Sequence, residues 1–140
     1  LVSLADLEPT ILNLAHTEIP ISVHARSLLR ILKKEDDAGK EFTVTSWPLY
    51  NPGEVTMAVD AMERGVQEPL PSTITTKDWT LIYSSYGYIS ELYHLPSDPR
   101  QEKNVIQDHP QVAKELHSRF ISQLKEEGTE NRLLAPRRSL

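Results

Sequence analysis

The chain has 140 residues, of which 39% are hydrophobic and 25% are charged, and its formal net charge is -5. This size and composition predict one globular domain with a real core. The acidic balance argues against nucleic-acid binding, which needs a basic face. No apolar run approaches the ~18 residues of a membrane span. The chain has no cysteine, which excludes disulfides, thiol nucleophiles and thiolate metal sites.

An apolar stripe at helical spacing predicts a first helix over residues 7–15. The stripe consists of Leu4, Leu7, Ile11 and Leu14. We expect Asp6 to cap the start of this helix and Pro9 to lie in its first turn, where a missing N–H costs little. A short apolar cluster at residues 28–32 then predicts one helical turn, and the charged run at residues 33–40 predicts a surface loop.

The middle of the chain predicts about four antiparallel strands, because the connections are too short for crossovers. The candidate strands are 42–47, 72–76, 79–84 and 89–94. Lys77 and Asp78 form the expected turn between the second and third, and residues 85–87 form a hairpin loop. Residues 50–71 are harder to interpret, with a short helix possible at 55–62.

A final helix is expected to open with a capping box between Asp108 and Gln111 and to end at Gly128. Its apolar face consists of Val112, Ala113, Leu116, Phe120, Ile121 and Leu124. We expect this helix to cover one face of the sheet. The predicted fold class is therefore α+β: an antiparallel sheet covered by a C-terminal helix and preceded by a short N-terminal helix.

Two blocks of the sequence share a pattern with a known enzyme family. In the first, Asp6, Pro9, Thr10, Arg26 and Ser27 match, whereas His16 and Ala25 stand where that family usually has Gly. The second block, residues 91–105, is more specific. Its matching residues are Glu91, Leu92, Tyr93, Leu95, Asp98, Pro99 and Asn104, whereas His94, Gln101 and Val105 depart from the pattern. Both blocks resemble the C-terminal region of the sulfatases, in the alkaline-phosphatase superfamily.

The second block also carries physical expectations of its own. Leu92 and Tyr93 should lie on opposite faces of a strand. Asp98 and Pro99 should form a turn, through the Asp side chain and the fixed proline φ. Asn104 should hydrogen-bond loop backbone ahead of the final helix.

The resemblance implies a C-terminal fragment of a sulfatase-like hydrolase, acting on sulfuric esters in the full-length parent. It divides the chain into a helical remnant of the catalytic α/β domain (1–35), an α+β subdomain (36–128) and a basic tail (129–140). It also implies a formylglycine nucleophile and a calcium ion for the parent, both held by residues that precede Asp6. We therefore expect no catalytic residue, metal site or cofactor in this chain.

Direct inspection agrees with that expectation. The nearest approach to the nucleophile motif, Ser97-Asp98-Pro99-Arg100, lacks the spacer between Pro and Arg, so we interpret it as a turn. The five histidines are scattered, and even His109 and His117 lie two helical turns apart, too far to share one ion.

Three alternatives remain open from the sequence. The chain is a piece of a sulfatase, a piece of a phosphate or phosphonate ester hydrolase of the same superfamily, or a stand-alone interaction or oligomerisation module. In each case we expect the N-terminal apolar stripe to be buried against another protein surface. We expect the missing catalytic domain to supply it in the parent and a homodimer to supply it in the isolated chain. Residues 50–71 are the candidate border of a substrate cleft.

Overall fold

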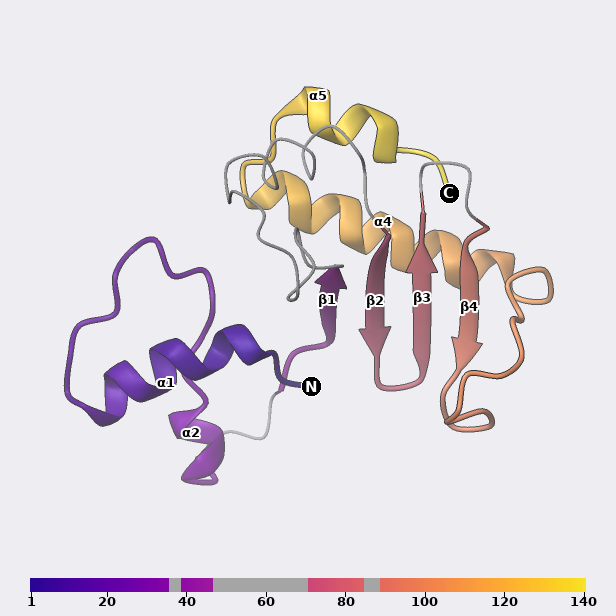
Figure 1. Cartoon of the computed structure of the whole chain (residues 1–140). Helices are drawn as coiled ribbons and strands as arrows, with labels where there is room; N and C mark the ends of the chain where they lie inside the picture. The colour runs from indigo at the N-terminus through magenta and orange to yellow at the C-terminus, as the bar shows by residue number, and fades with distance from the viewer. Residues whose placement is uncertain (36–38, 47–70, 85–88) are drawn as a thin grey trace, which may run out of the picture. The chain divides into compact units, whose positions relative to one another are not determined.

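A computed structural model describes residues 1–35, 39–46, 71–84 and 89–140 (Figure 1). The chain forms two compact units, Leu1–Thr43 and Val44–Leu140, and their boundary falls inside a strand. The division expected after residues 35 and 128 stays a prediction. The short helix considered at 55–62 and the loop at 85–87 lie outside the described residues, as does the cleft border proposed at 50–71 except for its last residue. None of the described helices is both long and apolar enough to cross a bilayer.

The N-terminal unit contains the 3₁₀ helix η1 (Leu4–Asp6) and the α-helices α1 (Leu7–Leu14) and α2 (Leu29–Leu32). The expected first helix is confirmed, but its start differs from the prediction. Ser3 caps η1 through a capping box, and the Asp6 side chain makes no capping bond to α1. The reason is that the Asp6 carboxylate turns back to the N–H of Ser3 and across to a distant loop.

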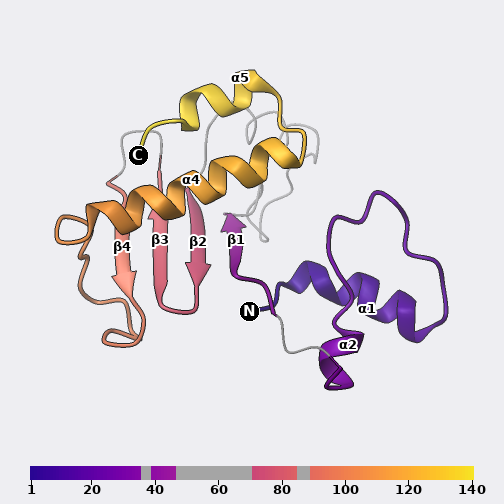
Figure 2. The same ribbon diagram turned by 180° about the vertical axis from the view of Figure 1, so that it is seen from behind.

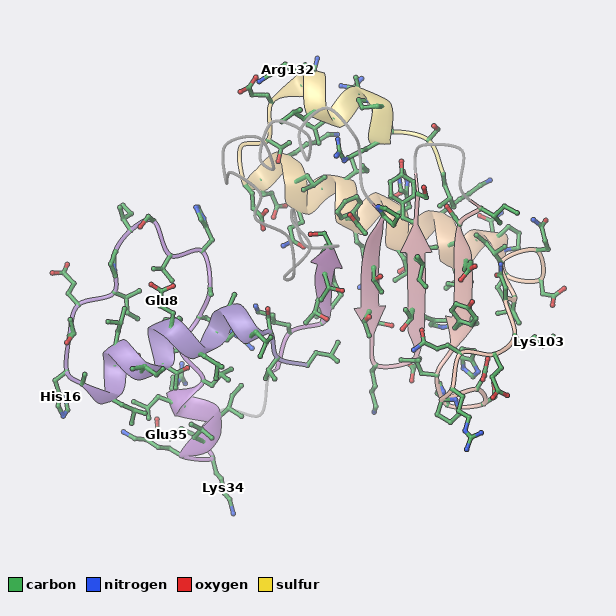
Figure 3. The ribbon with its side chains drawn as sticks, in the orientation of Figure 1. Glu8, His16, Lys34, Glu35, Lys103 and Arg132 are labelled. Atoms are coloured by element: carbon green, nitrogen blue, oxygen red, sulfur yellow. The ribbon has the colours of Figure 1, made fainter. Side chains whose placement is uncertain are left out.

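Both α-helices of this unit end in a residue with left-handed backbone geometry. His16 has φ 55° after α1 and Lys34 has φ 58° after α2. Around His16 the N–H of Thr17 donates to the carbonyl of Leu12, which is the Schellman arrangement. Both side chains project outward from the helix ends (Figure 3). His16 therefore adopts the conformation for which Gly is the usual residue.

The C-terminal unit is built on a sheet with strand order β1-β2-β3-β4. The strands are β1 (Phe42–Ser46), β2 (Ser72–Thr76), β3 (Trp79–Tyr83) and β4 (Glu91–His94). β2 pairs antiparallel with β3, and β3 with β4. Ile74, Leu81 and Leu92 lie opposite one another in this register and are fully buried. The predicted four-stranded antiparallel sheet is confirmed.

Helix α4 (Pro110–Glu126) covers one face of this sheet, as two opposite views show (Figures 1 and 2). Its buried residues are Ala113, Leu116, His117, Phe120 and Ile121. The predicted α+β architecture is therefore confirmed. The predicted capping box is not formed, because the N-cap is His109, with no side-chain cap bond. Pro110 takes the first helical position, which leaves Asp108 one residue too early to cap the helix.

The end of α4 follows the sequence prediction, and the chain continues beyond it into two short helices. Gly128 has φ 79°, and the N–H of Thr129 donates to the Leu124 carbonyl, so a Schellman motif ends the helix. Beyond it the chain forms α5 (Asn131–Leu134) and the 3₁₀ helix η2 (Ala135–Arg137). Leu134 is only 4% exposed. The segment after α4 is therefore folded, and its Leu134 is buried in the unit.

Candidate functional site

The first family-like block folds around the side chain of Asp6, which is fully buried. One carboxylate oxygen accepts a hydrogen bond from the N–H of Ser3 at 2.8 Å. The other accepts from the N–H of Arg26 at 3.3 Å and lies 2.7 Å from the Lys40 ammonium. Burial by itself raises the pKa of Asp6. The Lys40 ammonium and the two N–H groups more than offset that effect and hold the pKa below 3.8.

Thr10 extends this cluster to the next loop. Its hydroxyl donates to the Asp6 carbonyl at 2.5 Å and accepts from the N–H of Leu28 at 2.8 Å. Pro9 is buried beside it, and the Ser27 hydroxyl accepts from the N–H of Leu29 at 3.2 Å, at the start of α2. The structure thus gathers Asp6, Pro9, Thr10, Arg26 and Ser27 into one cluster. The side-chain oxygens of Asp6 and Thr10 bind backbone groups there, an arrangement that holds a loop in place.

The second block covers the outer edge of β4. The side-chain oxygen of Asn104 accepts from the N–H of Leu92 at 3.1 Å and from that of Ile106 at 3.0 Å. The N–H of Val105 donates to the Leu92 carbonyl at 2.8 Å. Both backbone groups of Leu92 on this edge are therefore paired, which closes a strand edge that would otherwise invite aggregation. The expected role of Asn104 is confirmed.

Asp98 nucleates the turn of this block. Its carboxylate accepts from the N–H of Lys103 at 2.9 Å and from that of Glu102 at 3.1 Å. These two donors lower the pKa of Asp98 below 3.8. Gln101, where the family usually has Glu, takes up a φ of 55°. The Ser97-Asp98-Pro99-Arg100 stretch is thus a turn, as the sequence predicted.

Glu91 and Tyr93 lie on the sheet face opposite the one that carries Leu92, since alternate residues of a strand face opposite ways. The Tyr93 hydroxyl donates to the Glu91 carboxylate at 2.6 Å. This bond, with burial, raises the pKa of Tyr93 to about 12. The tyrosine therefore stays protonated at neutral pH, which makes it a poor general base.

The N-terminal apolar stripe lies on the exposed side of η1 and α1. Leu4 is 86% exposed, and the exposed fractions of Leu7, Ile11 and Leu14 are 49%, 62% and 57%. The buried residues of these two helices are instead Asp6, Pro9 and Thr10. Within the described part of its own unit the stripe is thus at least half exposed or close to it, and it is the polar side of the helices that is buried.

Sequence reasoning missed one buried polar residue, His117. It is only 6% exposed, its Nε2 lies 2.8 Å from the Arg137 carbonyl oxygen, and its ring lies 4.6 Å from that of Tyr83. Burial lowers its pKa below 6.5. A signal was present, because His117 follows Ala113 by four residues and precedes Phe120 by three, on the apolar face of the helix.

A metal site in a protein needs several side-chain ligands that converge on one point. Within the described ranges, no group of three or more His, Cys, Asp or Glu is arranged to hold an ion.

No family model and no curated protein matches the chain, but solved structures do. A protein solved with its substrate D-glucosamine-2-N,6-O-disulfate is 20% identical, with a TM-score of 0.67 over 96% of this chain. A 2-O GAG sulfatase is 18% identical, with a TM-score of 0.68 over 96%. The phosphonate monoester hydrolase SpPMH from Silicibacter pomeroyi is 21% identical, with a TM-score of 0.66 over 86%.

The chain spans 25%, 28% and 24% of the lengths of these three proteins. The likeness extends over nearly the whole of this chain and over about a quarter of each neighbour. The sequence resemblance to sulfatases is therefore confirmed at the level of the fold: the chain has the fold of one portion of the sulfatases and phosphonate monoester hydrolases.

Proposed function

We propose that this chain is the C-terminal part of a sulfatase-like hydrolase, where it braces the catalytic domain and supplies no catalytic residue. The fold likeness supports this reading, since it covers almost all of this chain but a minor share of each hydrolase. The two blocks support it as well, because Asp6, Thr10, Asp98 and Asn104 use their side-chain oxygens to hold backbone.

The observation that carries the proposal is that the N-terminal helices η1 and α1 expose apolar side chains and bury polar ones. Leu4 and Ile11 are 86% and 62% exposed, whereas Asp6 is fully buried. Fully burying a Leu or Ile side chain is worth about 1.5–3 kcal/mol, so a bare stripe forgoes several such contributions. A surface that covers the stripe would recover them. In the parent hydrolase we assign that surface to the catalytic domain.

The first test is catalytic. The isolated 140-residue chain should not hydrolyse an aryl sulfate or an aryl phosphonate monoester, with or without added calcium. A rate that stays with the chain through successive purification steps would contradict the proposal. The second test is genomic: a Cys/Ser-x-Pro-x-Arg motif encoded upstream of Leu1 supports a sulfatase, and a start codon just before Leu1 contradicts the fragment.

The class of ester is a second question, because sulfatases and phosphonate monoester hydrolases are both among the fold neighbours. Whether the parent is a sulfatase or a phosphonate monoester hydrolase, the residues that distinguish the two esters are expected in the catalytic domain. Comparing the rates of the parent enzyme on a sulfate and a phosphonate with the same leaving group would separate them.

A stand-alone oligomerisation module is the alternative that the same stripe favours. Two copies of the isolated chain would then cover each other's Leu4, Leu7, Ile11 and Leu14. The main proposal also predicts a homodimer when the chain is isolated from its catalytic domain. A homodimer of the isolated chain is therefore compatible with both readings.

A further inference from the structure

Two residues of the core hold the C-terminal segment of the chain, 131–140, to the rest of its unit. The Tyr83 hydroxyl on β3 donates to the Ser139 carbonyl at 3.0 Å. His117 Nε2 on α4 donates to the Arg137 carbonyl at 2.8 Å. Both views place α5 alongside α4 and the C-terminus near the end of β3 (Figures 1 and 2). We call these two hydrogen bonds the C-terminal clasp.

The hydrogen bond of His117 sets its protonation state. A carbonyl oxygen only accepts, so Nε2 must carry the hydrogen and the neutral ring keeps its lone pair on Nδ1. Acidification adds a proton at Nδ1 and a charge to a ring that is 6% exposed and packed on the Tyr83 ring at 4.6 Å. A buried charge is costly unless it is paired.

The described residues around the ring offer it no counter-ion. The titratable groups that contact it are Tyr83 from β3 and Arg137 from η2, and the β2 residues beneath α4 are uncharged. The Arg137 guanidinium is cationic and donates to the Leu133 carbonyl at 2.5 Å. In the described ranges no carboxylate forms an ion pair with His117.

The direction of the pH effect follows from burial. Burial lowers the pKa of His117 below 6.5, and the hydrogen bond to Arg137 offsets this only in part. The clasped state therefore binds the proton less well than a released state with a solvated ring. The stability that neutral His117 gives the clasp is present above the free-ring pKa of about 6.5 and is lost as the pH falls below it.

We propose that the segment 131–140 is an acid-released strap, which protonation of His117 detaches while the sheet and α4 stay folded. Among the described residues, the segment is attached to the unit by the clasp, by buried Leu134 and by the packing of α5 on α4. Such peripheral segments open at lower free energy than the core. This inference does not rest on the proposed hydrolase function.

The test is amide hydrogen exchange on the full 140-residue chain, from about pH 7.5 to about pH 5, corrected for intrinsic exchange rates. The reporters are strap N–H groups: those of Leu133 and Leu134, which donate to the carbonyl of Glu130 just before the strap, and that of Arg138, which donates to the carbonyl of Ala135. Their protection should fall, with a ceiling of about 30-fold at pH 5 if the clasped ring stays neutral. The amides of β2 and β3 should keep their protection.

Three variants separate titration from packing. His117→Gln keeps an N–H donor but does not titrate, so the pH dependence of strap protection should disappear. Tyr83→Phe should lower protection at every pH and leave the dependence intact. His109→Gln, which removes an exposed histidine from the N-cap of the same helix, should behave as the unmodified chain.

Two results would overturn the proposal. One is an unchanged pH dependence in His117→Gln, and the other is a parallel loss of protection in the sheet, which would mean global unfolding. If His117→Gln does not fold, the proposal is tested instead by an NMR titration that measures the midpoint of the His117 ring in the unmodified chain. A midpoint at or above about 6.5 overturns the proposal, and a lower one supports it.

Discussion

The carboxylate of Asp6 accepts a hydrogen bond at 3.3 Å from the backbone N–H of Arg26, a residue 20 positions further along the chain. The same carboxylate meets the Lys40 ammonium at 2.7 Å. One buried side chain therefore joins the start of α1, the loop before α2 and the chain leading into β1. We expect the N-terminal unit to depend on this junction, because its apolar stripe is half exposed or more and can contribute little packing.

Replacing Asp6 with Asn should destabilise the N-terminal unit by about 2 kcal/mol. The substitution removes the partner of Lys40 and leaves one buried N–H poorly paired. Urea unfolding followed by circular dichroism measures the change. Glu8→Gln removes the same charge from an exposed position of α1 and should cost less than about 0.5 kcal/mol. Equal losses in the two variants would mean that the buried junction does not stabilise the fold.

The same carboxylate predicts a loss of stability in acid. The pKa of Asp6 is held below 3.8 in the folded state, despite burial, by Lys40 and by the N–H groups of Ser3 and Arg26. Its contribution is present above the unfolded pKa of about 3.9 and is lost as the pH falls through the folded value. The urea midpoint should thus drop below about pH 4 in the unmodified chain and drop less in Asp6→Asn. The same acid dependence in both would argue against Asp6 as its source.

Asn104→Ala should cost about 1 kcal/mol, because it removes the acceptor for two backbone N–H groups, those of Leu92 and Ile106. Asn104→Asp retains an acceptor oxygen and should recover most of the loss. Lys103→Ala, which shortens the exposed side chain next to it, is the matched control and should be close to neutral. Thermal unfolding measures all three. An Ala variant as stable as the control would show that the edge of β4 does not need this cap.

His16→Gly should stabilise the chain by up to about 1 kcal/mol. Left-handed geometry destabilises a non-Gly residue by roughly 1–2 kcal/mol. Gly removes this strain, but its larger conformational entropy in the unfolded state cancels part of the stabilisation. Gly128→Ala is the reverse experiment at the Schellman end of α4, where φ is 79° and a methyl group would meet no atom within 4 Å. It should destabilise by about 1 kcal/mol. Unfolding midpoints that move the same way in both variants would refute the conformational argument.

Leu7→Asp should convert a homodimer of the isolated chain into a monomer. Leu7 is 49% exposed within the stripe, and a charge there would be buried against an apolar surface on association. Light scattering at micromolar concentration gives the mass. Ile21→Asp adds the same charge at a fully exposed position outside the stripe and should leave the dimer intact. A monomeric mass for the unmodified chain would remove the homodimer from consideration.

Most of the fold could be predicted because its signals are local. Alternating β-branched residues at 42–46 and 72–76 predicted strands, and the step of four from Leu116 to Phe120 predicted the face of α4 that is buried. Gly128 predicted the end of that helix. The capping box at Asp108 failed although its spacing was right, because Pro110 shifted the first helical position by one residue.

The polar contacts were predicted only where their partners lie close in the sequence. The turn at Asp98 follows from the sequence, because its donors, Glu102 and Lys103, are four and five residues away. The pairing of Asp6 with Arg26 and Lys40 does not follow, because nothing in the local pattern brings those segments together. The resemblance marked Asp6 as important without saying what it binds.

The sequence by itself determined the α+β class, the spacing of each helix face and strand, and the blocks that resemble the sulfatases, since these depend on residues a few positions apart. Only the tertiary structure decided which side of α1 is buried, that His117 is a core residue, and that the tail returns to meet Tyr83 and His117. Those outcomes depend on which distant surfaces meet. Burial depends on the packing of the whole chain. The pattern of apolar and polar residues along one helix shows which face could be buried, but not which surface packs against it.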